Sequence, residues 1–328
     1  MDPTASGRPR ARGGGWGDIV TRYAVAWVLV GLIIGFWIAL PDTFGQWRTV
    51  QTLLVTQTVA GILALAVIFP LVIGEFDLSI GMIAGFTALI VAYLNGPGHW
   101  NTAGTLAVGL LVGPTLGLIN GLLISQLHID ALIATLAVAT LLQGSAIAVS
   151  TNNVATDPNR KLTSWAQTMI LGQIPVTAIY LLAVALTVWF LIDVTAWGRY
   201  LRVVGANRRS ALLIGLPVAR LRLTAFVVAG LLAGVAGVVN TMQIGSASQS
   251  DGAPLLLPAY AAAFVGATTI KPGRFNVLGT LLAVFLLAVG ITGIQLLGGP
   301  EWVQYIFNGT ALVVAVVLPS RFRRTFPA

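Results

Sequence analysis

The stretch Gly74-Glu75-Phe76-Asp77-Leu78-Ser79-Ile80-Gly81 decides how the rest of the chain is arranged, because it places two acidic residues between two long apolar segments. Residues 50–73 before it and 78–94 after it are almost free of charge. A carboxylate near lipid costs about 2.5–3.5 kcal/mol on insertion scales, so both acids need a partner, a helix end or water. We expect Asp77 or Ser79 to cap the helix that begins here, where free N–H groups favour an anionic oxygen.

The composition is that of a polytopic membrane protein. Over 328 residues the mean hydropathy is +0.90, with 57% hydrophobic and 9% charged residues, whereas a soluble domain carries about 25% charged residues. The net charge of +8 does not indicate nucleic acid, because the basic residues lie in the loops between apolar segments. The chain has no cysteine, which excludes a disulfide framework, a thiol nucleophile and a thiolate metal site.

Ten apolar segments predict an all-α fold of about ten transmembrane helices, since each span takes roughly 20 apolar residues. They are residues 23–40, 50–73, 78–94, 105–127, 131–149, 175–192, 221–241, 255–270, 277–297 and 303–318. Ten spans put both termini on one side, and every basic residue except Arg48, Arg160 and Lys161 then falls on that side. By the positive-inside rule this side is the cytoplasm. A re-entrant segment 255–270 would move the last arginines outside, so we reject it.

Two stripes of small residues predict close helix packing. One contains Gly109, Gly113, Gly117 and Gly121, and the other contains Ala229, Gly230, Ala233, Gly234 and Gly237. Their partners can be helices of the same subunit or of a second subunit.

The stretch 74–78 has a faint echo in Gly273-Arg274-Phe275-Asn276-Val277, and each follows a short apolar helix and opens another. Repeated halves are common in transporters. Both stretches fall on the cytoplasmic side of the predicted topology, however, which an inverted repeat does not predict.

The sequence lacks the usual patterns of catalysis and of nucleotide binding. No G-x-x-x-x-G-K-[ST] pattern occurs, and His99 and His128 lie in loops on opposite faces without a nearby carboxylate pair, so no metal site is expected. Ionisable residues are almost absent from the middle of the helices, whereas ion-driven transport usually needs several. These absences favour a pore or translocator that draws its energy from another subunit over a membrane enzyme.

The long loop at residues 194–220 contains a predicted short helix at Ser210–Ile214, with Asn207 as its N-cap and Gly215 as its stop. A short helix that projects from a membrane bundle can dock on a partner. The alternative is a charged loop that only fixes the topology.

Here the chain resembles a known family. Phe76-Asp77-Leu78-Ser79-Ile80-Gly81 is similar to the I-D-L-S-V-G signature of bacterial ABC-transporter permeases of the ribose/xylose/arabinose class. The similarity continues in order at Asn120-Gly121, Ile133-Ala134-Thr135-Leu136, the loop Gly198-Arg199…Gly205…Asn207…Ala211…Gly215, the helix 229–237, Ala261-Ala262…Gly266, Gly273-Arg274 and Gly279-Thr280.

The resemblance implies a homo- or heterodimeric permease in the bacterial inner membrane, with no cofactor of its own. A cytoplasmic ATP-binding subunit would drive import, and an extracytoplasmic solute-binding protein would deliver a monosaccharide or sugar-like solute. Residues 1–20 would be a disordered cytoplasmic N-terminus, 21–320 a single permease domain in contact with membrane lipid, and 321–328 a cytoplasmic tail.

The resemblance also implies residue roles. The segment 207–215 corresponds to the coupling loop that inserts into the ATPase, which gives the coupling candidates Gly198, Arg199, Asn207, Arg208, Arg209, Ala211 and Gly215. The family loop usually carries acidic residues where this chain has Arg208 and Arg209, which implies a more acidic groove on the ATPase. The signature residues Glu75, Asp77, Ser79 and Gly81 are gating candidates.

A neutral hydroxylated solute suits a pathway lined by amide and hydroxyl groups, which exchange hydrogen bonds with water at little net cost. The pathway candidates are Thr56, Gln57, Thr135, Thr140, Gln143 and Asn240, although each can instead bond to a neighbouring helix. The alternatives are an ABC permease for amino acids and an ion- or proton-coupled secondary carrier.

Overall fold

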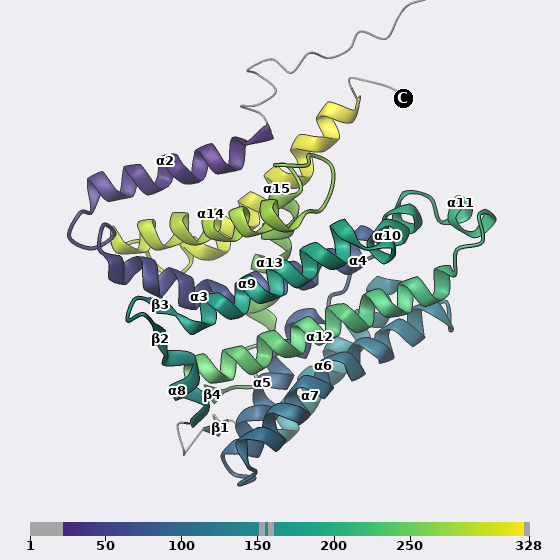
Figure 1. Cartoon of the computed structure of the whole chain (residues 1–328), viewed down its shortest axis with the longest axis horizontal. Coiled ribbons are helices and arrows are strands. Elements are labelled where there is room, and N and C mark those ends of the chain that lie inside the picture. The colour runs from purple at the N-terminus through teal and green to yellow at the C-terminus, as the bar shows by residue number, and fades with distance from the viewer. Residues whose placement is uncertain (1–21, 151–154, 157–160, 325–328) are drawn as a thin grey trace, which may run out of the picture.

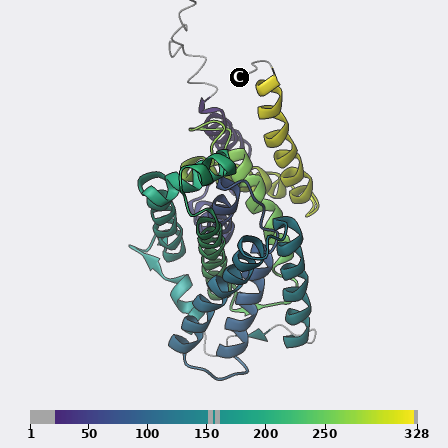
Figure 2. The same ribbon diagram turned by 90° about the vertical axis from the view of Figure 1, so that its right-hand side faces the viewer.

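The computed structural model describes residues 22–150, 155–156 and 161–324. The expected N-terminal segment 1–20 lies outside these residues. The described chain is a bundle of long helices that run roughly along one direction (Figures 1 and 2). The last helix continues to Arg324, past the domain boundary expected at residue 320.

Helices make up almost all of the regular structure. In chain order they are α2 (Ala24–Ala39), α3 (Trp47–Ala66), α4 (Ile68–Val72), α5 (Ile80–Asn95), α6 (Thr102–Ser125), α7 (Ala131–Val149), α8 (Lys161–Gln167), α9 (Val176–Trp189), the π-helix η1 (Phe190–Val194), α10 (Ala196–Ala206), α11 (Arg208–Leu213), α12 (Val218–Ile244), α13 (Ala253–Gly266), α14 (Val277–Leu296) and α15 (Val303–Arg324). Two short antiparallel ribbons depart from the all-α expectation. They pair β1 (Ala155–Thr156) with β4 (Ser246–Ala247), and β2 (Met169–Ile170) with β3 (Ile174–Pro175).

Each of the ten predicted apolar segments forms a helix, but their lengths differ. Among the described residues, six helical stretches are long and apolar enough to cross a membrane: α3 with α4, α6, α7, α9 with η1, α12 and α14. The apolar helices α2, α5, α13 and α15 are shorter. The number of crossings therefore stays a prediction.

One helix boundary corrects the sequence analysis. α12 begins at Val218 rather than at residue 221, so that Arg220 lies inside a helix. Arg222, which was counted among the basic residues of the preceding loop, also lies in this helix. Pro217 precedes the first turn and has no N–H to leave unpaired, which suits a helix start at this point.

α12 lies at the centre of the bundle, where it packs on α6, α5 and α3. The two small-residue stripes meet here. A Cβ atom added at Gly113 would overlap the carbonyl oxygen of Gly230, and one added at Gly117 would overlap that of Phe226. The α6 and α12 backbones thus touch directly. Of the two alternatives, packing within one subunit is confirmed for these stripes.

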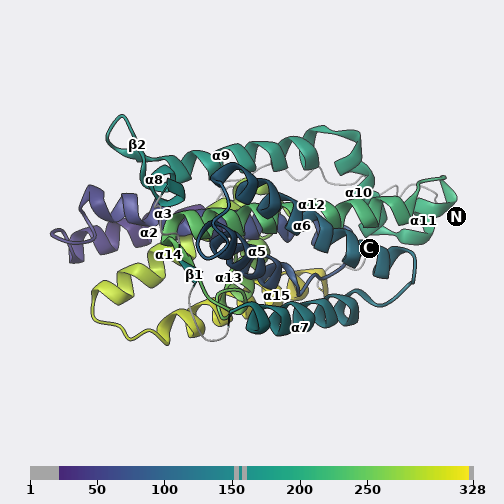
Figure 3. The same cartoon turned by 90° about the horizontal axis from the view of Figure 1, so that it is seen from below.

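The bundle has two distinct ends (Figures 1 and 3). At the α11 end lie α4, α10, α11, the end of α6 and the starts of α7 and α12. At the opposite end lie the starts of α3 and α6, the ribbons and α8. The segment 73–79, here called the signature loop, connects α4 to α5.

α10 packs against the rest of the bundle close to the signature loop. Gly205 lies so near the carbonyl oxygen of Val72 that a Cβ atom would not fit. Trp197 packs on Phe69, with ring centroids 5.6 Å apart, and its Nε1–H donates to Thr224 Oγ1 at 3.1 Å. α10 therefore contacts both α4 and α12.

Candidate functional site

The signature loop is held by side chains from three helices that are distant in sequence. The Asp77 N–H donates to the hydroxyl of Tyr260 on α13 at 2.8 Å, and that hydroxyl donates to the Asp77 carbonyl oxygen at 3.0 Å. The Leu78 N–H donates to Thr135 Oγ1 on α7 at 3.1 Å, and Asn120 Nδ2 on α6 donates to Ser79 Oγ at 2.7 Å. The loop is thus a junction between α6, α7 and α13.

The expected helix cap at Asp77 or Ser79 is wrong. α5 begins at Ile80, and its N-cap residue Ser79 makes no capping bond with its side chain. Asp77 Oδ1 instead accepts from the Ser79 N–H at 3.0 Å and from the Ser79 hydroxyl at 2.6 Å. The carboxylate closes a tight turn just before the helix, as short polar side chains often do. Both residues are fully buried.

The similar stretch at residues 273–277, in contrast, contains a true helix cap. Asn276 Oδ1 accepts from the Gly279 N–H at 2.8 Å and so caps α14. Gly74 and Gly273 both have φ of +80°, a conformation that favours glycine. Phe76 and Phe275 contact the same ring, Phe264, at centroid distances of 6.2 and 5.6 Å. The two stretches meet at this ring.

Glu75, whose side chain is 13% exposed, forms an ion pair with the buried Arg222 on α12. Arg222 Nε donates to Glu75 Oε1 at 2.6 Å, Arg222 Nη2 pairs with the same oxygen, and Nη1 donates to the Ile124 carbonyl oxygen at 3.0 Å. Only 6% of Arg222 is exposed. This pair ties the signature loop to the end of α6 and the start of α12. Glu75 Oε2 is buried and has no partner among the described residues.

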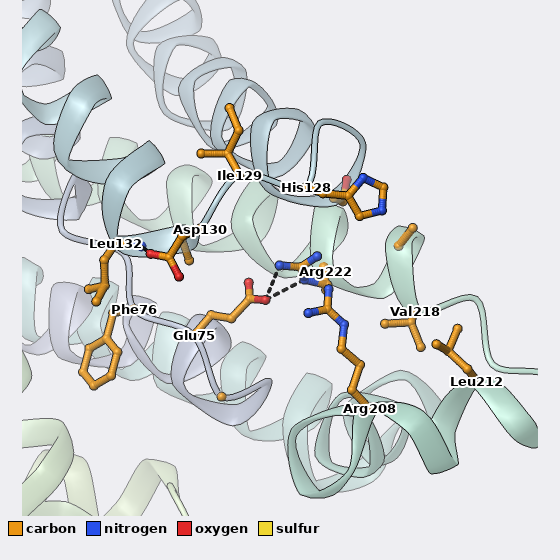
Figure 4. A pocket seen from close by; sticks show the side chains of 14 residues that line it. Glu75, Phe76, His128, Ile129, Asp130, Leu132, Arg208, Leu212, Val218 and Arg222 are labelled. Carbon is orange, nitrogen blue, oxygen red and sulfur yellow. Dashed lines mark hydrogen bonds and ion pairs between the residues drawn. The ribbon is translucent and has the colours of Figure 1, made fainter.

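A cavity of about 690 Å³ opens beside this ion pair (Figure 4). We call it the charged cavity, because Glu75, Asp130, Arg208 and Arg222 line it together with His128. Arg208 extends from α11 toward Arg222. Partial burial lowers the pKa of the Arg208 guanidinium, the nearby positive charge of Arg222 lowers it further, and Glu75 raises it.

α11 has the ends that were predicted, although it spans Arg208–Leu213 rather than Ser210–Ile214. Asn207 Oδ1 accepts from the Ser210 N–H at 3.0 Å, which confirms the N-cap. Gly215 has φ of +80°, and its N–H donates to the Leu212 carbonyl oxygen at 3.0 Å, which confirms the stop.

Sequence reasoning missed the apolar tip of α11. Leu212, Leu213 and Ile214 are exposed by 58%, 88% and 68%, whereas Ala211 is fully buried. Three consecutive apolar residues follow Arg208 and Arg209 in the sequence, a pattern that could have predicted an exposed apolar contact surface. Gly198, another coupling candidate, is buried against the end of η1, and the Arg199 Nη1 donates to the Val194 carbonyl oxygen at 3.0 Å. Gly198 is therefore packed at the start of α10, whereas Arg199 is exposed and bonds back to the end of η1.

The six pathway candidates do not lie together. Thr135 holds the signature loop, Thr140 is exposed on α7, Gln143 Nε2 donates to the Gln249 carbonyl oxygen at 3.3 Å, and Asn240 is buried on α12. Only Thr56 and Gln57 line a common cavity, of about 560 Å³, between α3, α13, α14 and α15 near the opposite end. We call it the uncharged cavity.

The described residues thus form a bundle of apolar helices with a short, capped helix projecting at one end. The chain belongs to the family described as branched-chain amino acid transport system / permease component, whose model matches residues 49–316. It is therefore a permease subunit, a transport component and not an enzyme, and the resemblance drawn from the sequence is confirmed.

Three relatives illustrate the similarity. The chain is 32% identical over 319 residues to the L-arabinose ABC transporter permease protein of Azospirillum brasilense, covering 96% of this chain and 91% of the relative. It is 31% identical over 284 residues to the ribose import permease protein of Bacillus subtilis, covering 86% and 88%. It is 26% identical over 297 residues to the D-allose transport system permease protein of Escherichia coli, covering 90% and 91%.

Proposed function

We propose that this permease subunit translocates a monosaccharide or sugar-like solute in an ATP-driven, binding-protein-dependent importer. The observation that carries this proposal is the similarity to an arabinose permease over nearly the full length of both chains. The family description also mentions branched-chain amino acids, so import of an amino acid is the second candidate. The relatives compared above favour the sugar.

α11 is the contact through which a separate ATPase moves the permease. Its exposed leucines and isoleucine support this role, because an apolar tip flanked by Arg208 and Arg209 suits a groove with an apolar floor and acidic rim. Asn207 and Gly215 fix where the helix begins and ends. α10 carries the motion on toward the signature loop, because Gly205 lies against Val72, the last residue of α4 before that loop.

The α11 end faces the cytoplasm in this proposal, and ten helices cross the membrane. Arg199, Arg202, Arg208, Arg209 and Arg220 lie at that end, whereas Arg48 begins α3 at the other. A solute-binding protein then docks at the opposite end, and a second permease subunit completes the pore. The cysteine-free chain permits a direct test. In intact cells, Ala206→Cys should be shielded from an impermeant thiol reagent and Ser164→Cys should be labelled.

The function is tested by reconstituting the chain in liposomes with its ATPase and solute-binding protein. We expect ATP-dependent uptake of at least one of L-arabinose, D-ribose and D-allose, and no uptake of L-leucine. Uptake by the chain alone in response to an ion gradient would instead indicate a secondary carrier. Uptake of leucine alone would replace the sugar with an amino acid.

A further inference from the structure

We propose that the uncharged cavity is a binding site for a neutral, polyhydroxylated solute on its way through the permease, an inference that rests on the proposed function. The cavity lies near the opposite end from α11, and its volume of about 560 Å³ falls in the range of about 300–1,000 Å³ found for small-molecule sites. Its position and chemistry both differ from those of the charged cavity.

The polar groups of this cavity are amides and hydroxyls. Thr52, Thr56 and Gln57 come from α3, Gln295 from α14, and Gln304 and Asn308 from α15, and no charged residue is among the described residues that line it. Amide groups both donate and accept hydrogen bonds, as sugar hydroxyls do. A zwitterionic amino acid would find no opposite charge here, and burying an unpaired charge is costly. The lining therefore selects a neutral solute.

Asn308 places a buried amide in the wall of the cavity. Its side chain is buried, with 7% exposed, and its Oδ1 has no hydrogen-bond partner among the described residues. A buried unpaired acceptor costs about 1–3 kcal/mol. A rotation of the Asn308 side chain that turns this oxygen into the cavity would let a solute hydroxyl donate to it and remove that cost.

Gln57 and the neighbouring threonine show how the α3 wall is arranged. Thr56 Oγ1 donates to the Thr52 carbonyl oxygen at 2.9 Å, and Gln57 Nε2 donates to Thr56 Oγ1 at 3.2 Å. An amide has two N–H groups and an oxygen with two lone pairs, so this one bond leaves Gln57 capacity for a ligand. Leu255 and Pro258 of α13 form an apolar wall that suits the C–H groups of a sugar ring.

The binding test uses the full chain in lipid nanodiscs and saturation-transfer NMR, with D-ribose, L-arabinose, D-allose and L-leucine as probes. We expect saturable binding of at least one of the three sugars and none of leucine. Gln57→Leu and Asn308→Leu should each weaken that binding about 2- to 10-fold, the worth of one neutral hydrogen bond. The double variant should weaken it further.

Two control variants each remove a polar side-chain group that lies outside the cavity. Gln51→Leu removes an amide from another face of α3, and Thr187→Val removes a hydroxyl from the exposed face of α9. Neither residue lines the cavity, so both variants should bind the sugar as the wild-type chain does. Absence of sugar binding to the wild-type chain, or full binding by the double variant, overturns the proposal.

Uptake by the reconstituted importer separates this inference from the proposed function. A wild-type importer that takes up none of the sugars refutes the proposed function. An importer that takes up a sugar with the same KM in the wild type and in the Gln57→Leu/Asn308→Leu variant refutes only the binding site. Light scattering measures the oligomeric state of the double variant. A change from dimer to monomer would show that the cavity is a subunit interface, which also refutes the proposal.

Discussion

The charged and uncharged cavities have similar volumes, about 690 and 560 Å³, but they use their polar groups in opposite ways. In the charged cavity, Glu75 and Arg222 bond to each other and to the backbone of α6, so that they hold three segments together. In the uncharged cavity, the buried oxygen of Asn308 has no protein partner among the described residues. The comparison teaches that the charged pair joins separate segments of the fold, whereas the uncharged cavity is lined by amides and hydroxyls outside any ion pair. Each cavity also contains a buried side-chain oxygen without a partner among the described residues, Glu75 Oε2 and Asn308 Oδ1.

α13 connects the two regions. Leu255 and Pro258 near its start line the uncharged cavity, while Tyr260 bonds the signature loop and stacks on Phe76, with ring centroids 5.9 Å apart. Phe76 in turn lines the charged cavity. A small shift of α13 therefore reaches both cavities.

The largest expected effect tests the structural role of the charged pair. Arg222→Leu leaves Glu75 buried without a partner and should lower the free energy of unfolding by about 3–5 kcal/mol. Asn308→Leu, the same kind of change in the uncharged cavity, should not lower it and should raise it by up to about 1–3 kcal/mol, because a buried unpaired acceptor is removed. Denaturant unfolding in detergent measures both.

A double variant sharpens this result. Glu75→Leu/Arg222→Leu should regain most of the lost stability, because an apolar pair can replace a buried ion pair at little cost. Equal stability of Arg222→Leu and the wild type would mean that the two cavities do not differ as described.

The next largest effect concerns binding of the ATPase at the α11 end. Arg208→Glu/Arg209→Glu should weaken binding of the ATPase about 30-fold or more, because losing charge partners at an interface costs about 2–5 kcal/mol. Arg48→Glu reverses a charge at the opposite end and should leave that affinity unchanged. Co-purification at increasing ATPase concentration measures both. Wild-type affinity in the double variant would mean that the two arginines only mark the cytoplasmic side.

A smaller effect tests how closely α10 is seated. Gly205→Leu forces a side chain against the Val72 carbonyl and should destabilise the protein by about 1–3 kcal/mol. Gly144→Leu is the matched control, because no atom lies within 4 Å of the added Cβ in α7. Thermal unfolding of the two variants gives the comparison, and equal melting temperatures would argue against a tight contact at Gly205.

The smallest effect is local to α11. Asn207→Ala removes the cap and should weaken that helix by about 1 kcal/mol. The Ser210 amide should then exchange with deuterium about fivefold faster, while Asn207→Asp, which keeps an acceptor oxygen, should exchange like the wild type. Unchanged exchange in Asn207→Ala would show that packing alone defines the helix.

Local patterns in the sequence predicted much of this structure. Each of the ten apolar runs located a helix, although α8 and α10 were not predicted in this way. The types of residue at Asn207 and Gly215 located the ends of α11, because caps and stops depend on near neighbours. The glycine stripes of α6 and α12 could be identified in the same way, although their mutual contact could not.

Long-range pairings were not predictable from such patterns. Glu75 was expected to need a partner, but Arg222 was assigned to a loop because it lies at the edge of an apolar run. Asp77 looked like a helix cap from its spacing, but its carboxylate accepts from the N–H and the hydroxyl of Ser79, in the turn before α5 begins. Two of the six pathway candidates, Thr56 and Gln57, line the uncharged cavity, and the other four do not. Its other polar groups lie on α14 and α15, far away in sequence.

The direct contact between α6 and α12 has a consequence for biosynthesis. α12 is synthesised only after α7, α8, α9, α10 and α11. Until then, the glycine face of α6 lies in the membrane without α12, its partner in the folded protein. Helices α3, α5 and α6 are all inserted before the helix that packs between them. The centre of the bundle therefore closes late, and a chain truncated before residue 218 would present to lipid, chaperone or protease the faces that the finished protein conceals.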